Sequence, residues 1–307
     1  MLRFALILLA AACAHAQLTP QQSAALDARI RERATGFPGH VALYARNLKT
    51  GAEYGLHPDE QVRTASTIKL PILCALHDQI AQGKLRWDDE ITLTEADTVA
   101  GSGILREFSP GTRHRVRDVA NLMIVVSDNT ATNLILGRIT ADAVNEYTVK
   151  LGILNTKSLR KVRGDGNQLK SPSGFAHEGL MPEYRRFGLG VSTPRDMVRL
   201  LELIEAGKVV SPKDSQEILA VLGRQQFKDS IGRRLPDRWV FSKSGSLDAL
   251  RSDVGIVRTP AGPVAMALTV DGMPGTDYGP ENAGQRLLSD LAQILLAALT
   301  QSDRMLR

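Results

Sequence analysis

The two ends of the chain carry strand-like patterns of apolar positions. Near the N-terminus, an amphipathic stretch over residues 20–35 predicts a helix. Two short apolar runs follow, over 41–45 and 53–56, and the polar, Gly-containing segment 47–51 between them predicts a turn. We therefore expect a helix followed by a pair of strands in this part of the chain.

The C-terminal third repeats the strand pattern and ends in a helical one. Residues 239–242, 253–257 and 264–270 are apolar runs rich in β-branched side chains, and they predict three strands. Residues 281–300 have helical spacing of leucines.

The middle of the chain, residues 62–206, is mostly helical in pattern. Strongly apolar helical runs cover 117–126 and 129–139. Thr193, followed by proline, predicts a helix start, and Gly207 predicts the end of that helix.

This order predicts an α+β protein whose sheet is built from both ends of the chain. The expected sheet domain comprises residues 17–61 and 207–307, and an all-α domain of residues 62–206 is inserted between its halves.

The first sixteen residues predict a secretory signal peptide. Arg3 precedes a ten-residue apolar run, and Ala14-His-Ala16 supplies small residues at a cleavage site before Gln17. The alternatives are a lipid anchor on Cys13 and a buried N-terminal helix. No later segment has 18 consecutive apolar residues, so we expect a periplasmic protein without a further span.

Composition adds limits rather than a function. The chain has 307 residues, of which 43% are hydrophobic and 23% charged, which excludes a disordered or collagen-like protein. The net charge of +5 is too small to argue for nucleic acid. After removal of residues 1–16 the charge is 5 − 1 = +4 and one cysteine remains, Cys74. It cannot form an internal disulfide, and its apolar surroundings predict burial.

The first motif with chemistry is Ser66-Thr-Ile-Lys69, at the start of an apolar helical run. Three positions apart on a helix, both side chains lie on one face, where a desolvated lysine can take the serine proton. A second such pair, Ser158-Leu-Arg-Lys161, lies in a basic loop without an apolar helix behind it. We expect it to have no catalytic role.

Two further motifs supply polar groups. Ser127-Asp-Asn129 interrupts two apolar helical runs, and can present a hydroxyl and an amide or simply cap a helix. Lys243-Ser-Gly245 ends the predicted strand 239–242, where it can bind a carboxylate. The similar Lys49-Thr-Gly51 is better explained as a turn.

The three motifs in this order, separated by 61 and 116 residues, resemble the penicillin-recognising serine hydrolases. That family includes class A β-lactamases and penicillin-binding proteins. Gly101-Ser-Gly-Ile-Leu105 and Asn121-Leu-Met-Ile124 extend the resemblance, which covers about residues 20–300. It implies a five-stranded antiparallel sheet flanked by helices and an all-α domain, with the site between them.

The resemblance also implies a role for each motif residue. Ser66 is the expected acylated nucleophile, Lys69 a candidate base, and Ser127 a proton relay to the leaving nitrogen. Asn129 is expected to bind the side-chain amide of the substrate. Lys243, Ser244 and Gly245 are expected to bind its carboxylate. The backbone N–H groups of Ser66 and Ser246 are expected to bind the oxyanion. Arg251 either assists the carboxylate or is an ordinary surface arginine.

One feature of the class A pattern is missing. Those enzymes carry a glutamate in a loop, with an asparagine four residues later, and this glutamate activates the deacylating water. Here Glu178 and Glu183 are followed at that spacing by Pro182 and Phe187. Glu178 is the better placed candidate, and the alternative is a solvated loop carboxylate.

We therefore predict a monomeric class A-like β-lactamase that acts on a small-molecule β-lactam. The alternatives are a D,D-peptidase-like penicillin-binding enzyme, a non-catalytic β-lactam- or peptidoglycan-binding module, and a serine-dependent glutaminase. The five histidines after residue 16 have no ligand spacing, and we expect neither a metal nor a cofactor. The basic cluster Arg113–Arg117 is expected to be a solvated helix start and not a nucleic-acid site.

Overall fold

The computed structural model describes residues 17–162 and 174–301. The predicted signal peptide and the possible anchor at Cys13 lie outside the described residues. Five antiparallel strands form the main sheet in the order β2-β1-β10-β9-β8. Their bounds are β1 His40–Asn47, β2 Glu53–Leu56, β8 Val240–Leu247, β9 Leu250–Thr259 and β10 Gly262–Asp271. Because β1 pairs with β10, both ends of the chain build one sheet, which confirms the predicted fold class.

The strand that carries Lys243 is longer than predicted. Ser242 was expected as its last residue, which is wrong, because β8 continues to Leu247. The extension pairs with β9 down to a tight hairpin, where Leu247 lies opposite Leu250. Its Lys, Ser and Gly residues do not alternate as apolar and polar, so the hydrophobic pattern could not reveal the extension.

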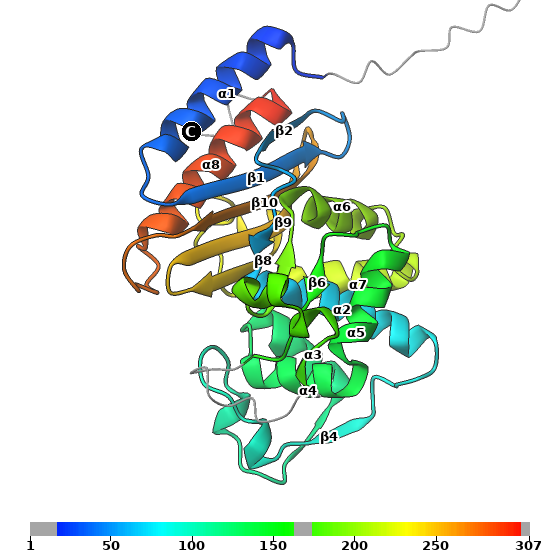
Figure 1. Ribbon diagram of the computed structural model, residues 1–307. Coiled ribbons are helices and arrows are strands. Elements are labelled where there is room, and N and C mark those ends of the chain that lie inside the picture. Colours follow the sequence, from blue (N-terminus) through cyan, green and yellow to red (C-terminus); the bar gives the residue numbers. More distant parts are fainter. Residues whose placement is uncertain (1–16, 163–173, 302–307) are drawn as a thin grey trace, which may run out of the picture.

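Two terminal helices cover one face of the sheet. Helices α1 (Pro20–Thr35) and α8 (Ala283–Thr300) lie side by side on it (Figure 1). Thr19 caps α1 by accepting from the backbone N–H of Gln22. Leu26 and Ile30 of α1 are buried in the core between the helices and the sheet, so the predicted amphipathic pattern is confirmed.

The other face of the sheet meets the helical group. Helices α6 (Pro194–Glu205) and α7 (Pro212–Gly223) pack on the sheet, and the remaining helices are α2 (Lys69–Ala81), α3 (Val116–Val125), α4 (Asn129–Ile139) and α5 (Ala141–Lys150). Thr193 caps α6 through the N–H of Asp196. The two-domain division stays a prediction, since the helical core continues onto the sheet through Val254 and Ile256.

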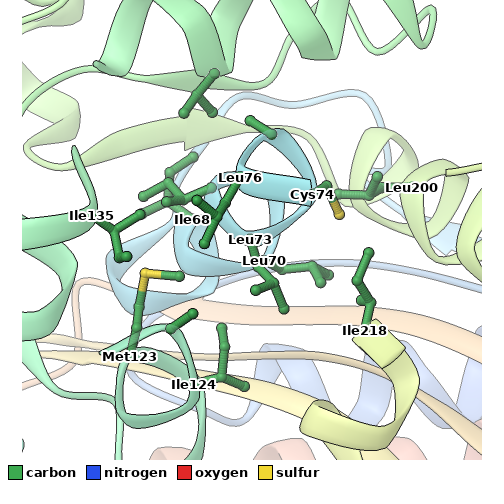
Figure 2. Close-up of a cluster of buried hydrophobic side chains, with 14 of the residues drawn as sticks. Ile68, Leu70, Leu73, Cys74, Leu76, Met123, Ile124, Ile135, Leu200 and Ile218 are labelled. Carbon is green, nitrogen blue, oxygen red and sulfur yellow. The ribbon is translucent and has the colours of Figure 1, made fainter. Parts of the chain in front are cut away.

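Helix α2 runs through the middle of the helical core. Side chains from α3, α4, α6 and α7 surround it (Figure 2). Cys74 of α2 is fully buried, as predicted, and its burial raises the pKa of the thiol. Since α2 is held on all sides, its N-terminal end is a rigid base for the residues that precede it.

Two small sheets were not predicted. One contains β3 (Val62–Arg63), β7 (Gly190–Ser192) and β6 (Lys157–Ser158), and the other pairs β4 (Glu90–Thr92) with β5 (Arg113–Arg115). Strands of two or three residues are too short to leave an alternating pattern. Arg113 and Arg115, from the basic cluster, form ion pairs with Glu90 and Asp88. Within the described residues, no helix combines the length and apolar character needed to cross a bilayer.

Candidate active site

Ser66 lies in a strained turn between strand β3 and helix α2. It belongs to the 3-10 helix η1 (Ala65–Ile68), and α2 begins directly afterwards at Lys69. A 3-10 helix has three residues per turn, so Ser66 and Lys69 lie on one side. Ala65 has a φ of +48°, an uncommon conformation for a residue with a Cβ. The helical spacing assumed from the sequence is present, although the first turn is 3-10 and not α.

Lys69 is a fully buried amine surrounded by neutral acceptors. Its Nζ donates to the Ser127 carbonyl at 2.6 Å and to Asn129 Oδ1 at 2.9 Å, and it lies 3.2 Å from Ser127 Oγ. Burial, and then the nearby Lys243, hold the pKa of Lys69 well below its usual value, and Asp128 opposes them only in part. A neutral amine has two N–H groups and one lone pair. With the N–H groups given to Ser127 O and Asn129 Oδ1, the lone pair is free to accept a proton.

The Ser127 turn is fixed by the loop before α3. Ser127 has a φ of +52°, and the next side chain, Asp128, accepts from the N–H groups of Ile104 and Leu105 at 2.7 and 2.8 Å. Asp128 also caps α4 through Ala131 N–H. The cap interpretation is therefore correct for Asp128, and it leaves the Ser127 hydroxyl and Asn129 facing Lys69.

Two glycines allow that loop to approach so closely. A Cβ on Gly101 would lie 2.5 Å from Asn129 Nδ2, and one on Gly103 would lie 2.2 Å from the Asp128 carboxyl carbon. Both glycines have positive φ, which a side chain disfavours. The sequence segment Gly101-Ser-Gly thus has a physical reason for its composition.

Lys243 reaches the same hydroxyl from the sheet. Its Nζ donates to Ser127 Oγ at 3.0 Å and to the Ser244 carbonyl at 2.7 Å. Burial lowers the pKa of Lys243 to about 7, while Asp253 opposes that shift. Ser127 Oγ therefore lies between two lysine amines and can accept from either while its own proton remains available to a third group.

Gly245 brings strand β8 against the turn that carries Ser66. A Cβ at Gly245 would come within 2.8 Å of the Thr64 carbonyl oxygen and 3.0 Å of the Ser66 nitrogen. Ser244 N–H points to the open edge of β8, because it donates to Gln225 and not to β9. Backbone groups alternate along a strand, so Ser246 N–H also faces that edge. The two predicted oxyanion donors, Ser66 and Ser246, thus flank the close contact at Gly245.

Gln225 is a site residue that the sequence did not indicate. It is 2% exposed and lies just after α7. Its carboxamide binds Ser242 and Ser244 on the open edge of β8. A single glutamine after a helix carries no signal in the sequence, and only the fold brings it to the strand.

Arg251 is buried among carbonyl groups. It is 1% exposed, so the interpretation as a surface arginine is wrong. Nη1 donates to the carbonyls of Leu247 and Leu250 at 2.6 Å each, and the guanidinium lies over the Tyr278 ring at 4.9 Å. It thereby fixes the β8–β9 hairpin, and its role toward a substrate carboxylate stays a prediction.

Glu178 binds two polar partners, neither of which belongs to the hydrogen-bond network of Lys69 with Ser127 and Asn129. It accepts from Asn145 Nδ2 at 2.9 Å and lies 3.2 Å from Lys157 Nζ. Burial alone would raise the pKa of Glu178, but its hydrogen bonds to the backbone, Asn145 and Lys157 outweigh this and lower it. Glu178 is therefore not simply a solvated carboxylate. No hydrogen bond within the described ranges joins it to Ser66, Lys69 or Ser127.

Comparison with known proteins agrees with this arrangement of fold and motifs. A family model described as the β-lactamase enzyme family matches residues 25–299, and the chain belongs to that family. Its fold is the one found in β-lactamase-like serine hydrolases.

Individual relatives include both enzymes and a regulator. The chain is 27% identical to the β-lactamase regulatory protein BlaB of Streptomyces cacaoi over 83% of this chain and 91% of BlaB. It is 25% identical to β-lactamase L2 of Stenotrophomonas maltophilia over 80% and 77% of the two chains.

Among solved structures, a β-lactamase from Sphaerobacter thermophilus is similar with a TM-score of 0.77 and 28% identity, over 93% of this chain and 99% of that one. PBP-A is similar with a TM-score of 0.75 and 25% identity, over 91% and 97%.

Proposed function

We propose that the protein is a periplasmic serine hydrolase that β-lactams acylate on Ser66 and that hydrolyses the resulting ester. The observation that carries this proposal is the position of Ser127 Oγ between the buried amines of Lys69 and Lys243. Ser66 lies on the same side of the chain as Lys69 and next to Gly245. The similarity to several β-lactamases supports the same class of substrate.

The buried amine gives the acylation step a base. Lys69 Nζ takes the Ser66 hydroxyl proton as Oγ forms its bond to the lactam carbonyl carbon. The N–H groups of Ser66 and Ser246 stabilise the oxyanion. When the C–N bond breaks, the ring nitrogen takes the proton of Ser127, and the Lys69 ammonium returns its proton to Ser127. Hydrolysis by water then releases the acid and restores the Ser66 hydroxyl.

The remaining site residues bind the two ends of the ligand. Lys243 and Ser244 bind the carboxylate from β8. Asn129 binds the amide of the ligand side chain, while its Oδ1 keeps its bond to Lys69. Glu178 is the proposed residue for activating the deacylating water, on the basis of its position before the Thr193 helix start.

One observation favours a second candidate, in which deacylation is slow and the natural substrate is a D-Ala-D-Ala peptide. Glu178 is tied to Asn145 and Lys157, and loss of a well-placed general base typically costs about 10²–10⁴ in rate. A variant of PBP-A, whose structure is an acyl-enzyme complex with penicillin G, is similar to this chain with a TM-score of 0.76.

A chromogenic cephalosporin separates the two candidates. The chain 17–307 is mixed with excess substrate, and product is followed together with the intact mass of quenched protein. Hydrolysis predicts product far beyond one equivalent, with further loss of turnover in Glu178→Gln. A burst near one equivalent and a lasting adduct would support the D,D-peptidase-like candidate, or a β-lactam-binding module without turnover if D-Ala-D-Ala peptides are also left uncleaved. Absence of both product and adduct would contradict the proposal.

A further inference from the structure

Gln225 occupies the open edge of β8 next to the proposed carboxylate-binding residues. Nε2 donates to the Ser242 carbonyl at 2.6 Å. Oε1 accepts from Ser244 N–H at 3.2 Å and from Ser244 Oγ at 2.7 Å. The side chain is 2% exposed; its bond to Ser242 is buried, and its bonds to Ser244 are partly buried. A buried amide with every polar atom partnered is a fixed part of the structure.

The carboxamide takes the place of a neighbouring strand. Ser242 O and Ser244 N are the outward backbone groups of residues two apart on an edge strand, which an added strand would bind through its own peptide groups. Gln225 satisfies both with one side chain. The open backbone edge available to a ligand therefore begins at Ser246, next to Ser66.

Ser244 is held from two sides. Lys243 Nζ donates to its carbonyl oxygen, and Gln225 Oε1 accepts from its N–H and its hydroxyl. Because Oε1 has two donors, the hydroxyl can turn its proton toward an anion while the N–H still satisfies the amide. Gln225 thus fixes the position of the Ser244 hydroxyl oxygen, and the hydroxyl proton can still be donated to a ligand anion.

We propose that Gln225 is a positioning residue that sets Ser244 for recognition of the ligand carboxylate. This inference rests on the proposed function, since it concerns the same acylation of Ser66. It assigns part of the selectivity for carboxylate-bearing ligands to a residue outside the three motifs. Gln225 acts through Ser244 and does not itself touch the ligand.

The test compares acylation of Ser66 by benzylpenicillin and by its methyl ester, which lacks the carboxylate. Gln225→Met keeps the length of the side chain and removes both polar atoms. We expect the acid-to-ester ratio of acylation rate constants to fall about tenfold, as for loss of a hydrogen bond to a charged group. Gln226→Met is the matched control, because that neighbouring glutamine is exposed, and its ratio should stay within about twofold of the parent.

A double-mutant cycle separates positioning from general damage. Ser244→Ala alone should lower the ratio, and adding Gln225→Met to it should change the ratio by less than about twofold. Should Gln225→Met fail to fold, Gln225→Asn withdraws the amide by one methylene and is expected to give the same fall.

Two outcomes overturn the inference. One is an unchanged ratio, which includes equal loss for both ligands, and the other is a rise in the ratio, which would mean that Gln225 competes with the ligand for the hydroxyl. If the parent chain is acylated and one of these results is found, the role of Gln225 is contradicted while the proposed function stands. If neither ligand acylates the parent chain, the proposed function fails and this inference fails with it.

Discussion

Helix α2 buries two basic side chains, Lys69 at its start and His77 two turns later, and the protein treats them differently. His77 Nδ1 lies 2.9 Å from the Asp214 carboxylate. The His77 and Trp87 rings pack edge to face, with their centroids 4.8 Å apart. Burial lowers the pKa of His77, and Asp214 partly offsets that shift. Lys69 instead contacts a carbonyl, an amide and a hydroxyl, with a second lysine nearby.

The different partners of His77 and Lys69 indicate a structural role for His77 and a chemical role for Lys69. His77 has a carboxylate partner that partly offsets the effect of burial on its pKa, and the contact joins α2 to α7. Burial of an amine among neutral acceptors lowers its pKa, which favours the neutral form that can accept a proton. Positive φ angles at Ala65 and Ser127 occur on the Lys69 side, where the surrounding structure must hold these unfavourable conformations.

The largest expected effect comes from removing the reactive amine. Lys69→Met should slow acylation by about 10²–10⁴-fold, because Ser66 loses its base. The free energy of unfolding should change little, since the removal of a desolvated amine offsets the loss of its hydrogen bonds to Ser127 O and Asn129 Oδ1. Stopped-flow acylation and urea denaturation measure the two quantities, with the exposed Lys84→Met as control. Normal acylation in Lys69→Met would contradict the assignment of the base.

A smaller loss should follow from separating β8 from the Ser66 turn. Gly245→Ala adds a Cβ that would lie 2.8 Å from Thr64 O and 3.0 Å from Ser66 N, so one of the elements must move. Displacements of about 1 Å can cost about 10²-fold in rate. Gly36→Ala is the control, because its Cβ would meet only Glu32 O at 3.6 Å. Equal acylation in both variants would show that the contact does not position the site.

The charge on Lys243 should make acylation by a carboxylate-bearing ligand depend on pH. Burial lowers the pKa of Lys243 to about 7, so its ammonium is charged below that pH and becomes neutral above it. The acid-to-ester ratio of acylation by penicillin should therefore fall as pH rises, by up to about tenfold per unit above the pKa. Rate profiles between pH 6 and 9 measure this. A ratio that does not vary with pH would exclude Lys243 as the titrating cation.

The smallest effect on chemistry should come from the structural pair. His77→Leu removes the partner of Asp214 and should lower the free energy of unfolding by about 1–3 kcal/mol. Acylation should remain within about twofold, because among the described residues His77 bonds to Asp214, whereas Lys69 bonds to Ser127 and Asn129. A large loss of acylation at unchanged stability would remove the distinction between the two bases.

Much of the fold and of the central site could be predicted from the sequence because the signals are local. The helix start at Thr193 depends on residues within one turn, and Ser66 with Lys69 share a face through simple helical spacing. The break that aims Ser127 is visible as a polar triplet between two apolar runs.

The rest depends on contacts between distant segments. Gln225 meets Ser244, and Glu178 meets Asn145, only after the chain has folded. Arg251 shows the same limit, since its position in the sequence did not reveal that Nη1 donates to the carbonyls of the β8–β9 hairpin. Neither the number of residues between such groups nor their type indicates which oxygen or nitrogen will be the partner.

The most direct measurement of the central claim is the intact mass and peptide map of the chain mixed with excess benzylpenicillin and quenched in acid during turnover, so that the acyl-enzyme is trapped before it is hydrolysed. The account predicts one adduct, carried by Ser66, in the parent chain and in Ser158→Ala, which removes the serine of the second Ser-x-x-Lys pair. Ser66→Ala should carry none. An adduct that persists in Ser66→Ala, or one that disappears in Ser158→Ala, would contradict the account.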